Sequence, residues 1–123
     1  MEKTILVIED DLFLQGLEVM KLKKEGYNVI PASNSVEAYR AMDTKKPISL
    51  MLLDLMLPEI DGFTILEKIR KDETYKDTPI IVFSNLYEEK DVSRANKLGI
   101  SQFMIKSNFT LDELIDKVKK LIK

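Results

Sequence analysis

The sequence predicts an α/β fold, a doubly wound parallel sheet of five strands with five helices on its two faces. Three observations indicate this architecture. Apolar runs of strand length recur along the 123 residues, longer segments of helical periodicity alternate with them, and three of the runs end in polar residues. Strands that alternate with helices favour a parallel sheet joined by right-handed crossovers. A chain of this length suits one domain, so we expect residues 1–123 to fold as a single unit.

The predicted strands are short and mostly apolar. Runs that are apolar at nearly every position are typical of strands buried on both faces of a sheet. The predicted strands cover residues 4–9, 28–32, 48–54, 79–84 and 102–105.

The first helix is predicted over residues 12–25. Phe13, Leu17 and Met20 recur within it at helical spacing. Gly26 follows as a residue that readily adopts the left-handed conformation of a helix end. The first helix is therefore expected to stop there.

The second and third helices are delimited by their flanking residues. Asn34, followed three residues later by Glu37, predicts an N-cap with its capping-box partner, and the helix should stop before Pro47. The third helix is expected to open after Asp61 and Gly62, where the glycine supplies a turn with positive φ. Its apolar positions at helical spacing are Phe63, Leu66 and Ile69.

The last two helices differ in how apolar they are. The fourth, over residues 87–98, is the least apolar and ends at Gly99. Its inner stripe consists of Val92, Ala95 and Leu98. The fifth opens with a capping box of Thr110 and Glu113 and then carries one continuous apolar face. That face consists of Leu111, Leu114, Ile115, Val118, Leu121 and Ile122.

Composition argues against several classes of function. With 19 basic and 21 acidic residues the formal net charge is −2, which gives no electrostatic basis for direct binding to nucleic acid or to an anionic membrane. The lack of cysteine, of a signal-peptide pattern and of a long apolar stretch leads us to expect a cytoplasmic protein. The chain also has no histidine, so any imidazole in its chemistry must come from a partner.

Polar side chains follow the ends of four predicted strands. Glu9 and Asp10 follow the first strand, and Asp54 ends the third. Ser84 ends the fourth strand, and Lys106 follows the fifth. The carboxyl ends of parallel strands share one edge of the sheet, and ligands bind there where the winding direction reverses. We therefore expect these side chains to gather around one site.

The chemistry of this set indicates phosphoryl transfer. Clustered carboxylates repel one another unless a cation or a proton is present, and ligation by oxygen alone suits Mg2+. Lys106 and Ser84 would neutralise and hydrogen-bond a phosphoryl group. Considered alone, Asp54 would be interpreted as a turn former or helix cap. With these neighbours it is better interpreted as a nucleophile that forms an acyl phosphate.

Four motifs make the chain resemble the receiver domain of two-component response regulators, especially the single-domain, chemotaxis-regulator-like kind. They are ILVIEDD at 5–11, LDLMLP at 53–58 with DG at 61–62, IVFS at 81–84 and FMIK at 103–106. Each motif is short, but their order at the ends of four strands makes the combination specific. The resemblance extends over essentially the whole chain and implies a flavodoxin-like sheet with strand order 2-1-3-4-5.

The resemblance also implies roles for individual residues. Asp54 would accept a phosphoryl group from a histidine kinase or a histidine phosphotransfer protein. Asp10, Asp54 and the backbone carbonyl of Met56 would bind Mg2+ directly. Glu9 would act on the metal through a water molecule, and Lys106 would pair with the phosphoryl oxygens.

The resemblance further implies how a signal would leave the domain. Ser84 and Phe103 would form the switch pair, with the hydroxyl moving toward the phosphoryl group and the ring turning inward. This repacks the face made by the fourth helix, the fifth strand and the fifth helix, through which a downstream effector protein would bind. Dimerisation on phosphorylation is a further expectation. The domain would be a phosphoacceptor that assists its own phosphorylation and dephosphorylation, and not an enzyme with an external substrate.

The chain departs from the family pattern at two places. The family usually has a proline after the lysine, commonly joined by a cis bond, where this chain has Ser107. A cis peptide bond to a residue other than proline costs about 2.5–4 kcal/mol. We therefore expect the Lys106–Ser107 bond to be trans and the loop to follow another path. Asn85 stands where a small residue is common, so it could crowd the acceptor or bond the phosphoryl group. Leu86 follows, where an apolar side chain is expected to slow hydrolysis.

Other interpretations remain open at this point. A degenerate receiver that binds partners without phosphorylation is favoured only by Asn85 and Ser107. An aspartate-based phosphatase needs a second aspartate two residues after the nucleophile, where this chain has Met56. A flavin or nucleotide carrier needs a loop rich in Gly, Ser or Thr after the first strand, and that loop is acidic here. Asp11 is interpreted as the N-cap of the first helix and not as a metal ligand.

Overall fold

The computed structural model of the protein describes residues 2–122. Five parallel strands form one sheet in the order β2-β1-β3-β4-β5, as predicted for a flavodoxin-like, doubly wound fold. The strands are β1 (Thr4–Ile8), β2 (Asn28–Ala32), β3 (Leu50–Leu53), β4 (Ile80–Ser84) and β5 (Gln102–Ile105). The helices are α1 (Leu12–Lys24), α2 (Ser35–Asp43), α3 (Gly62–Lys71), α4 (Glu89–Lys97) and α5 (Leu111–Leu121). A 3-10 turn, η1 (Lys106–Asn108), connects β5 to α5.

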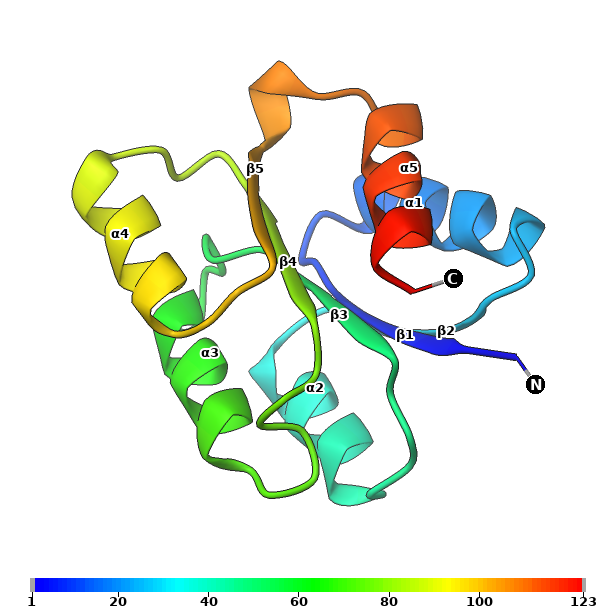
Figure 1. Ribbon diagram of the computed structural model, residues 1–123, viewed down its shortest axis with the longest axis horizontal. Coiled ribbons are helices and arrows are strands. Elements are labelled where there is room, and N and C mark those ends of the chain that lie inside the picture. Colours follow the sequence, from blue (N-terminus) through cyan, green and yellow to red (C-terminus); the bar gives the residue numbers. More distant parts are fainter. Residues whose placement is uncertain (1, 123) are drawn as a thin grey trace.

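The sheet lies between two layers of helices (Figure 1). Helices α1 and α5 cover one face, and α2, α3 and α4 cover the other. The strands are buried on both faces, so each face has its own apolar cluster. Complete burial of one Leu, Ile or Val side chain contributes about 1.5–3 kcal/mol, and the two clusters together are the main source of stability. Within residues 2–122, every helix is too short or too polar to cross a bilayer.

The register of the central strands aligns their carboxyl ends. Ile8 of β1 pairs with Leu53 of β3, and Leu53 pairs with Val82 of β4. The N–H of Asp54 continues this ladder by donating to the carbonyl of Ile8 at 3.0 Å. Residues that follow β1, β3 and β4 therefore emerge side by side at one edge of the sheet, as expected from the alternation of strands and helices.

Helix α1 presents a different face to the core from the one suggested by its apolar spacing. Its buried residues are Gln15, Glu18 and Leu22. In contrast, Phe13 is 79% exposed and Met20 is 48% exposed. Two polar contacts orient the helix: Asp11 caps its N-terminus, as predicted, and Gln15 Nε2 donates to the carbonyl of Glu9 at 3.0 Å. Because apolar residues occur nearly all round α1, their spacing alone does not select a face.

The glycine at the start of α3 permits a close approach of two backbone segments. Asp61 caps the helix, and Gly62 is its first residue. A Cβ atom on Gly62 would lie 2.4 Å from the Cα of Leu55, which no side chain tolerates. Positive φ angles occur instead at Gly26 and Gly99, the predicted ends of α1 and α4. The prediction of a positive φ at Gly62 is therefore wrong, and its hydrogen side chain is required for packing.

The remaining differences from the predicted elements lie mainly at their ends: three strands are one to three residues shorter than predicted, namely β1, β3 and β4. Helix α4 begins at Glu89, two residues later than predicted, and Glu88 makes no side-chain capping bond there. Asn34 caps α2 as predicted, but the carboxylate of Glu37 accepts from the N–H of Ser33 at 2.6 Å and not from that of Asn34. Leu121 is 40% exposed and so lies off the buried face of α5.

Arg70 ties together the chain segments at the end of the molecule opposite the carboxyl edge. It lies in the last turn of α3, and its guanidinium donates to carbonyls of the α3–β4 loop and of the C-terminal end of α4. The acceptors are Leu98 at 2.7 Å, Lys76 at 2.9 Å, Gly99 at 2.9 Å, Thr78 at 3.0 Å and Tyr75 at 3.5 Å. One side chain therefore satisfies several carbonyls that a helix end and a loop leave free.

Candidate functional site

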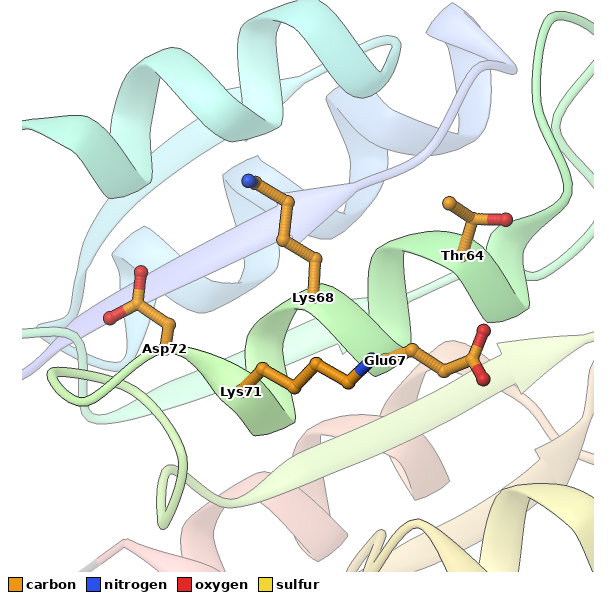
Figure 2. A pocket seen from close by; sticks show the side chains of 5 residues that line it. All are labelled: Thr64, Glu67, Lys68, Lys71 and Asp72. Carbon is orange, nitrogen blue, oxygen red and sulfur yellow. The ribbon is translucent and has the colours of Figure 1, made fainter.

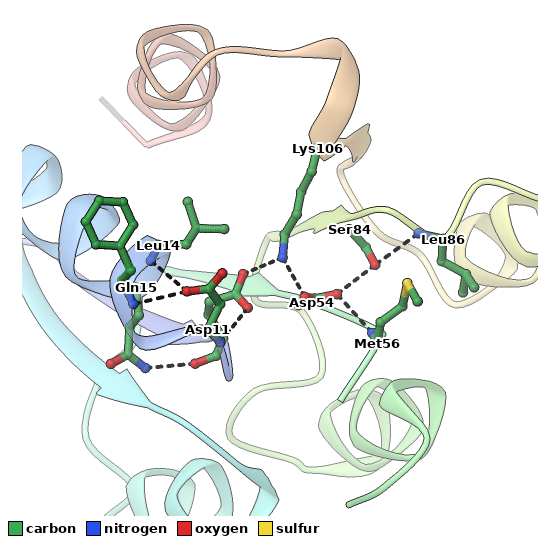
Figure 3. Close-up of polar contacts among 10 residues, drawn as sticks. Asp11, Leu14, Gln15, Asp54, Met56, Ser84, Leu86 and Lys106 are labelled. Atoms are coloured by element: carbon green, nitrogen blue, oxygen red, sulfur yellow. Dashed lines mark hydrogen bonds and ion pairs between the residues drawn. The ribbon is translucent and has the colours of Figure 1, made fainter. Parts of the chain in front are cut away.

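Asp54 lies directly after β3, and both of its carboxylate oxygens are engaged (Figure 3). The residue is 5% exposed. Its Oδ1 accepts from the hydroxyl of Ser84 at 2.7 Å and from the N–H of Met56 at 2.9 Å. Its Oδ2 accepts from Nζ of Lys106 at 2.6 Å. A carboxylate held by three donors has a fixed orientation, which a nucleophile needs.

Lys106 connects two carboxylates that come from neighbouring strands. Its Nζ lies 2.6 Å from Oδ2 of Asp54 and 2.6 Å from Oε1 of Glu9. The Lys106 side chain is 15% exposed and that of Glu9 is 2% exposed. When the carboxylates of Glu9, Asp10 and Asp54 are all ionised, Lys106 leaves the site with a net charge of −2, so it lacks the charge of one divalent cation.

The pKa values in the site reflect this shortage. Burial raises the pKa of Glu9 from 4.5 to about 7, and the charge of Asp54 adds to the rise, while the bonds from Lys106 and from the N–H of Asp11 oppose it. Burial also disfavours the charged form of Lys106, but its bonds to Asp54 and Glu9 outweigh that effect and raise its pKa. At neutral pH Lys106 is therefore protonated, and Glu9 is protonated in a substantial fraction of the molecules.

The acidic residues fit a hard divalent cation. One carboxylate oxygen from each of Glu9, Asp10 and Asp54 lies within 4.8 Å of the other two, and Asp10 is the member most accessible to solvent. Met56 is held beside them by the bond from its N–H to Asp54. A donor set made only of oxygen atoms suits Mg2+, which keeps part of its water shell. The chemistry of these residues therefore matches the predicted Mg2+ site.

A family model described as the response regulator receiver domain matches residues 5–119. The chain belongs to this family. It is 36% identical over 97% of its length to the transcriptional regulatory protein KdpE of Staphylococcus aureus, of which it covers 49%. The chain spans about half the length of the curated relatives it matches.

Solved receiver structures have the same fold. Response regulator TrrA of Thermotoga maritima, in complex with Mg(2+)-BeF, is 32% identical, with 98% of this chain and 99% of that chain covered and a TM-score of 0.81. The non-phosphorylated receiver domain of HemR from Leptospira biflexa is 30% identical, with 99% and 95% covered and a TM-score of 0.87. Both comparisons extend over nearly the whole receiver.

The predicted switch residues of the receiver lie on adjacent strands. Ser84 is fully buried at the end of β4 and pairs in register with Ile105 of β5. Phe103 precedes Ile105 by two positions on the same strand and packs, half-buried, against the cluster under α3 and α4. The N–H of Leu86 donates to the Ser84 hydroxyl at 3.3 Å. Ser84 therefore contacts both β5 and the loop that leads into α4.

The two departures from the family pattern are visible in the loops of the receiver. The bond between Lys106 and Ser107 is trans, as predicted. The chain then makes the turn η1, and Lys106 still reaches both acids. Asn85 is exposed, and its predicted contact with a phosphoryl group stays a prediction. The replacement of proline therefore leaves the contacts of Lys106 intact.

A hollow elsewhere on the receiver lacks the chemistry of the acid site. It has a volume of about 500 Å3 and lies on the outer side of α3 (Figure 2). Its lining residues are Thr64, Glu67, Lys68, Lys71 and Asp72. The Nζ atom of Lys68 lies over the ring of Tyr39, 5.0 Å from the ring centroid. The hollow contains no clustered acids, so the site at the carboxyl edge remains the candidate.

Sequence reasoning missed a third buried carboxyl group, Glu18 of α1, beside those of Glu9 and Asp54. Glu18 is 1% exposed, and its Oε1 has no hydrogen-bond partner among the described residues. Burial raises its pKa from 4.5 to about 8, and the charge of Glu9 adds to the rise. Glu18 is therefore mainly protonated at pH 7. No local signal indicated its burial, because an acid in a helix normally faces solvent.

Proposed function

We propose that this receiver domain is a signalling switch in which Asp54 accepts a phosphoryl group from a phosphohistidine of a partner protein. Membership of the family supports control by phosphorylation. The observation that carries the finer proposal is the engagement of both Asp54 oxygens, by Lys106 at 2.6 Å and by Ser84 at 2.7 Å. Because the chain has no histidine, that phosphohistidine belongs to a partner, and the family favours a histidine kinase or a histidine phosphotransfer protein as the donor.

The transfer exchanges one bond to phosphorus for another. An Asp54 oxygen attacks the phosphorus, the N–P bond of the donor breaks, and its electron pair stays on the imidazole nitrogen. A proton on the other ring nitrogen makes that imidazole a neutral leaving group. The product is an acyl phosphate on Asp54. Lys106 and Ser84 then pair with the phosphoryl oxygens and stabilise their charge.

The proposal includes Mg2+ as a cofactor, held by Asp10, Asp54 and the Met56 carbonyl directly and by Glu9 through water. When bound, the cation supplies the positive charge that the site lacks and offsets charge on the transferring group. The family and the cluster of oxygen donors support this assignment. Asp54 and Glu9 then no longer depend on Lys106 alone for neutralisation.

We propose that the signal leaves the site through the contacts of Ser84. Its hydroxyl leaves the N–H of Leu86 when it turns fully toward a phosphoryl group, which frees the β4–α4 loop. Phe103 turns inward into the space released. The surface of α4, β5 and α5 is then the region that a downstream effector protein recognises, and a second copy of the chain is one such partner.

We further propose that the domain is a phosphoacceptor that assists its own phosphorylation and dephosphorylation, and not an enzyme with an external substrate. Met56 stands where an aspartate phosphatase needs a second acid. The intact contacts among Glu9, Asp54 and Lys106 weigh against a degenerate receiver.

The test uses a phosphoryl mimic and a direct transfer assay. Beryllofluoride with Mg2+ should shift the amide resonances around Ser84 and Phe103 in the wild type and leave those of Asp54→Asn unchanged. A phosphorylated histidine kinase should label the wild type and not this variant. If the wild type shows neither spectral shift nor label, the proposed function is wrong.

A measurement of the phosphoryl lifetime tests the roles of Asn85 and Leu86, the two residues after Ser84. Leu86 is half-buried and packs against the core beside Ser84, so its apolar side chain limits the approach of water to the acyl phosphate. An Asn85→Ala, Leu86→Glu double variant should lose its phosphoryl group at a different rate, and faster if exclusion of water dominates. Unchanged decay would show that these positions do not control the lifetime.

A further inference from the structure

The loop between β3 and α3 begins at the phosphoacceptor and is closed tightly at its base. Met56 and Asp61 form an isolated antiparallel bridge across it. The N–H of Gly62 donates to the carbonyl of Leu55 at 3.1 Å. These backbones approach so closely that only glycine fits at position 62. This closure fixes where the loop begins and ends, whereas the orientation of the peptide groups between these points, starting with the Met56 carbonyl, also depends on what holds its tip.

The tip is held by Glu59, which reaches across to the start of α2. Its Oε1 accepts from the N–H of Ser35 at 3.1 Å, and its Oε2 accepts from the Ser35 hydroxyl at 2.8 Å. Ser35 is 7% exposed and is the first residue of α2. The N-cap Asn34 accepts only from the N–H of Glu37.

The contact is favourable at both of its ends. The first N–H groups of a helix have no partner within the helix, and Glu59 supplies one to Ser35. A negative charge at a helix N-terminus is also stabilised by the helix dipole. Charge-assisted hydrogen bonds are stronger than neutral ones, and two of them fix an orientation as well as a distance. Glu59 is thus a specific anchor for the loop.

We propose that Glu59 is a positioning residue for metal binding, which holds the β3–α3 loop so that the Met56 carbonyl is presented to the cation. This inference rests on the proposed function, in which Met56 is a ligand. Glu59 itself does not touch the metal in this proposal. Partners that bond a metal ligand directly change metal affinity by about 10–100-fold when they are removed, and Glu59, which acts through the loop, is expected at the lower end of that range.

The coupling also runs in the opposite direction. If the contact between Glu59 and Ser35 favours Mg2+ binding, then Mg2+ binding strengthens that contact by the same factor. The first turn of α2 would then report the occupancy of the site, although it contributes no ligand. This gives a readout that is independent of phosphoryl transfer.

Three variants separate positioning from charge. Glu59→Ala removes both bonds and should weaken Mg2+ binding about tenfold, measured by isothermal titration calorimetry. Glu59→Gln removes the charge but keeps two contacts, because its carbonyl accepts from the Ser35 N–H and its amide donates to the Ser35 hydroxyl. It should bind Mg2+ nearly as the wild type does. Ser35→Ala keeps the N–H and loses the hydroxyl, so it should lie between them. Circular dichroism establishes that each variant is folded at the temperature used.

Hydrogen exchange supplies the second measurement. Mg2+ should slow exchange of the Ser35 amide in the wild type and should leave it unchanged in Glu59→Ala. Equal Mg2+ affinity in the wild type and in Glu59→Ala overturns the inference alone. Equal weakening by the Gln and Ala variants would mean that charge and not position matters, and would overturn it too. If the wild type binds no Mg2+, the proposed function fails and this inference fails with it.

Discussion

Two buried glutamates of this receiver differ in how the burial of their carboxyl groups is compensated. Glu9, at the carboxyl edge, is 2% exposed and forms an ion pair with Lys106 at 2.6 Å. Glu18, on the inner side of α1, is 1% exposed and has an oxygen without a partner among the described residues. At the edge a cation compensates for burial, whereas in α1 a proton does. Burial alone therefore does not reveal which acid is functional.

The difference also explains why only the edge suits a divalent ion. Glu9 lies beside Asp54 and the accessible Asp10, so a cation that arrives from solvent relieves the repulsion among them. Among the described residues Glu18 belongs to no group of three acids that could share an ion, and it is buried away from water. The burial of Glu18 is therefore a cost to folding.

Replacement of Glu18 should have the largest effect on stability. Glu18→Met keeps the volume and removes an ionisable group, and we expect it to increase the free energy of unfolding by on the order of 3 kcal/mol at pH 8. The folded-state pKa of Glu18 is about 8, against 4.5 for the ordinary group. Its proton is thus bound more tightly in the folded state, and wild-type stability falls as pH rises from 4.5 to 8. Urea denaturation at pH 5 and pH 8 measures this.

A matched control separates ionisation from volume. Glu18→Gln cannot ionise but remains polar, so its advantage over the wild type should grow between pH 5 and pH 8 and stay level above that. Its free energy of unfolding should be lower than that of Glu18→Met at every pH. A gain that does not depend on pH in either variant would show that Glu18 is not protonated in the folded protein.

Loss of the positive charge of Lys106 should lower the free energy of unfolding, by somewhat less than Glu18→Met raises it. Lys106→Met leaves Glu9 and Asp54 buried without a counter-ion, and it should lower the free energy of unfolding by about 2 kcal/mol at pH 8. At pH 5 the loss should be smaller, because Glu9 can take up a proton. Thermal melts at the two pH values measure the difference. An equal loss at both would mean that lost packing of the lysine stem is the cause.

Mg2+ should stabilise the edge by an amount set by its occupancy. At a free concentration about ten times the dissociation constant, the wild type should gain about 1.4 kcal/mol. Asp54→Asn should gain less at the same concentration, because it lacks one negative charge and one ligand. Differential scanning calorimetry with and without Mg2+ tests this, with Ca2+-free and Mg2+-free buffer as the reference. No gain in the wild type would contradict the assignment of the metal site.

An exposed ion pair should show almost no effect. Lys21 of α1 lies 2.8 Å from Asp112 of α5, but the Asp112 side chain is 83% exposed. Water and salt screen such a pair. Asp112→Asn should leave the melting temperature within the error of the measurement. A clear loss that disappears in high salt would show that this pair holds the two helices together.

Much of the fold follows from local patterns. The alternation of apolar runs and helical segments predicted all five strands and a parallel sheet, and the Thr110 and Glu113 capping box is present as predicted. The strand order followed from the family resemblance. The strand ends placed Glu9, Asp54 and Lys106 at one edge, where the structure brings them together. These successes share a cause, because each depends on residues close in sequence or on a general rule of parallel sheets.

The rest depends on contacts between distant segments. The face that α1 buries is selected by the bond from Gln15 to the Glu9 carbonyl, and the packing at Gly62 depends on where Leu55 lies. The bond between Ser35 and Glu59 joins residues 24 positions apart. Such contacts leave no periodic trace in the sequence, so reasoning from spacing could not find them.

The hydrogen bonds made by Arg70 hold one end of helix α4 in place. Arg70 binds the carbonyls that end α4, whereas the other end of this helix begins without a side-chain cap. The nine residues of α4 span about 13 Å, so a small tilt about the tied end becomes a larger displacement at the free end, near the loop from Ser84. A tilt of α4 about its tied end would therefore move the N-terminal turn, which lies nearest the loop from Ser84, farther than the rest of the helix.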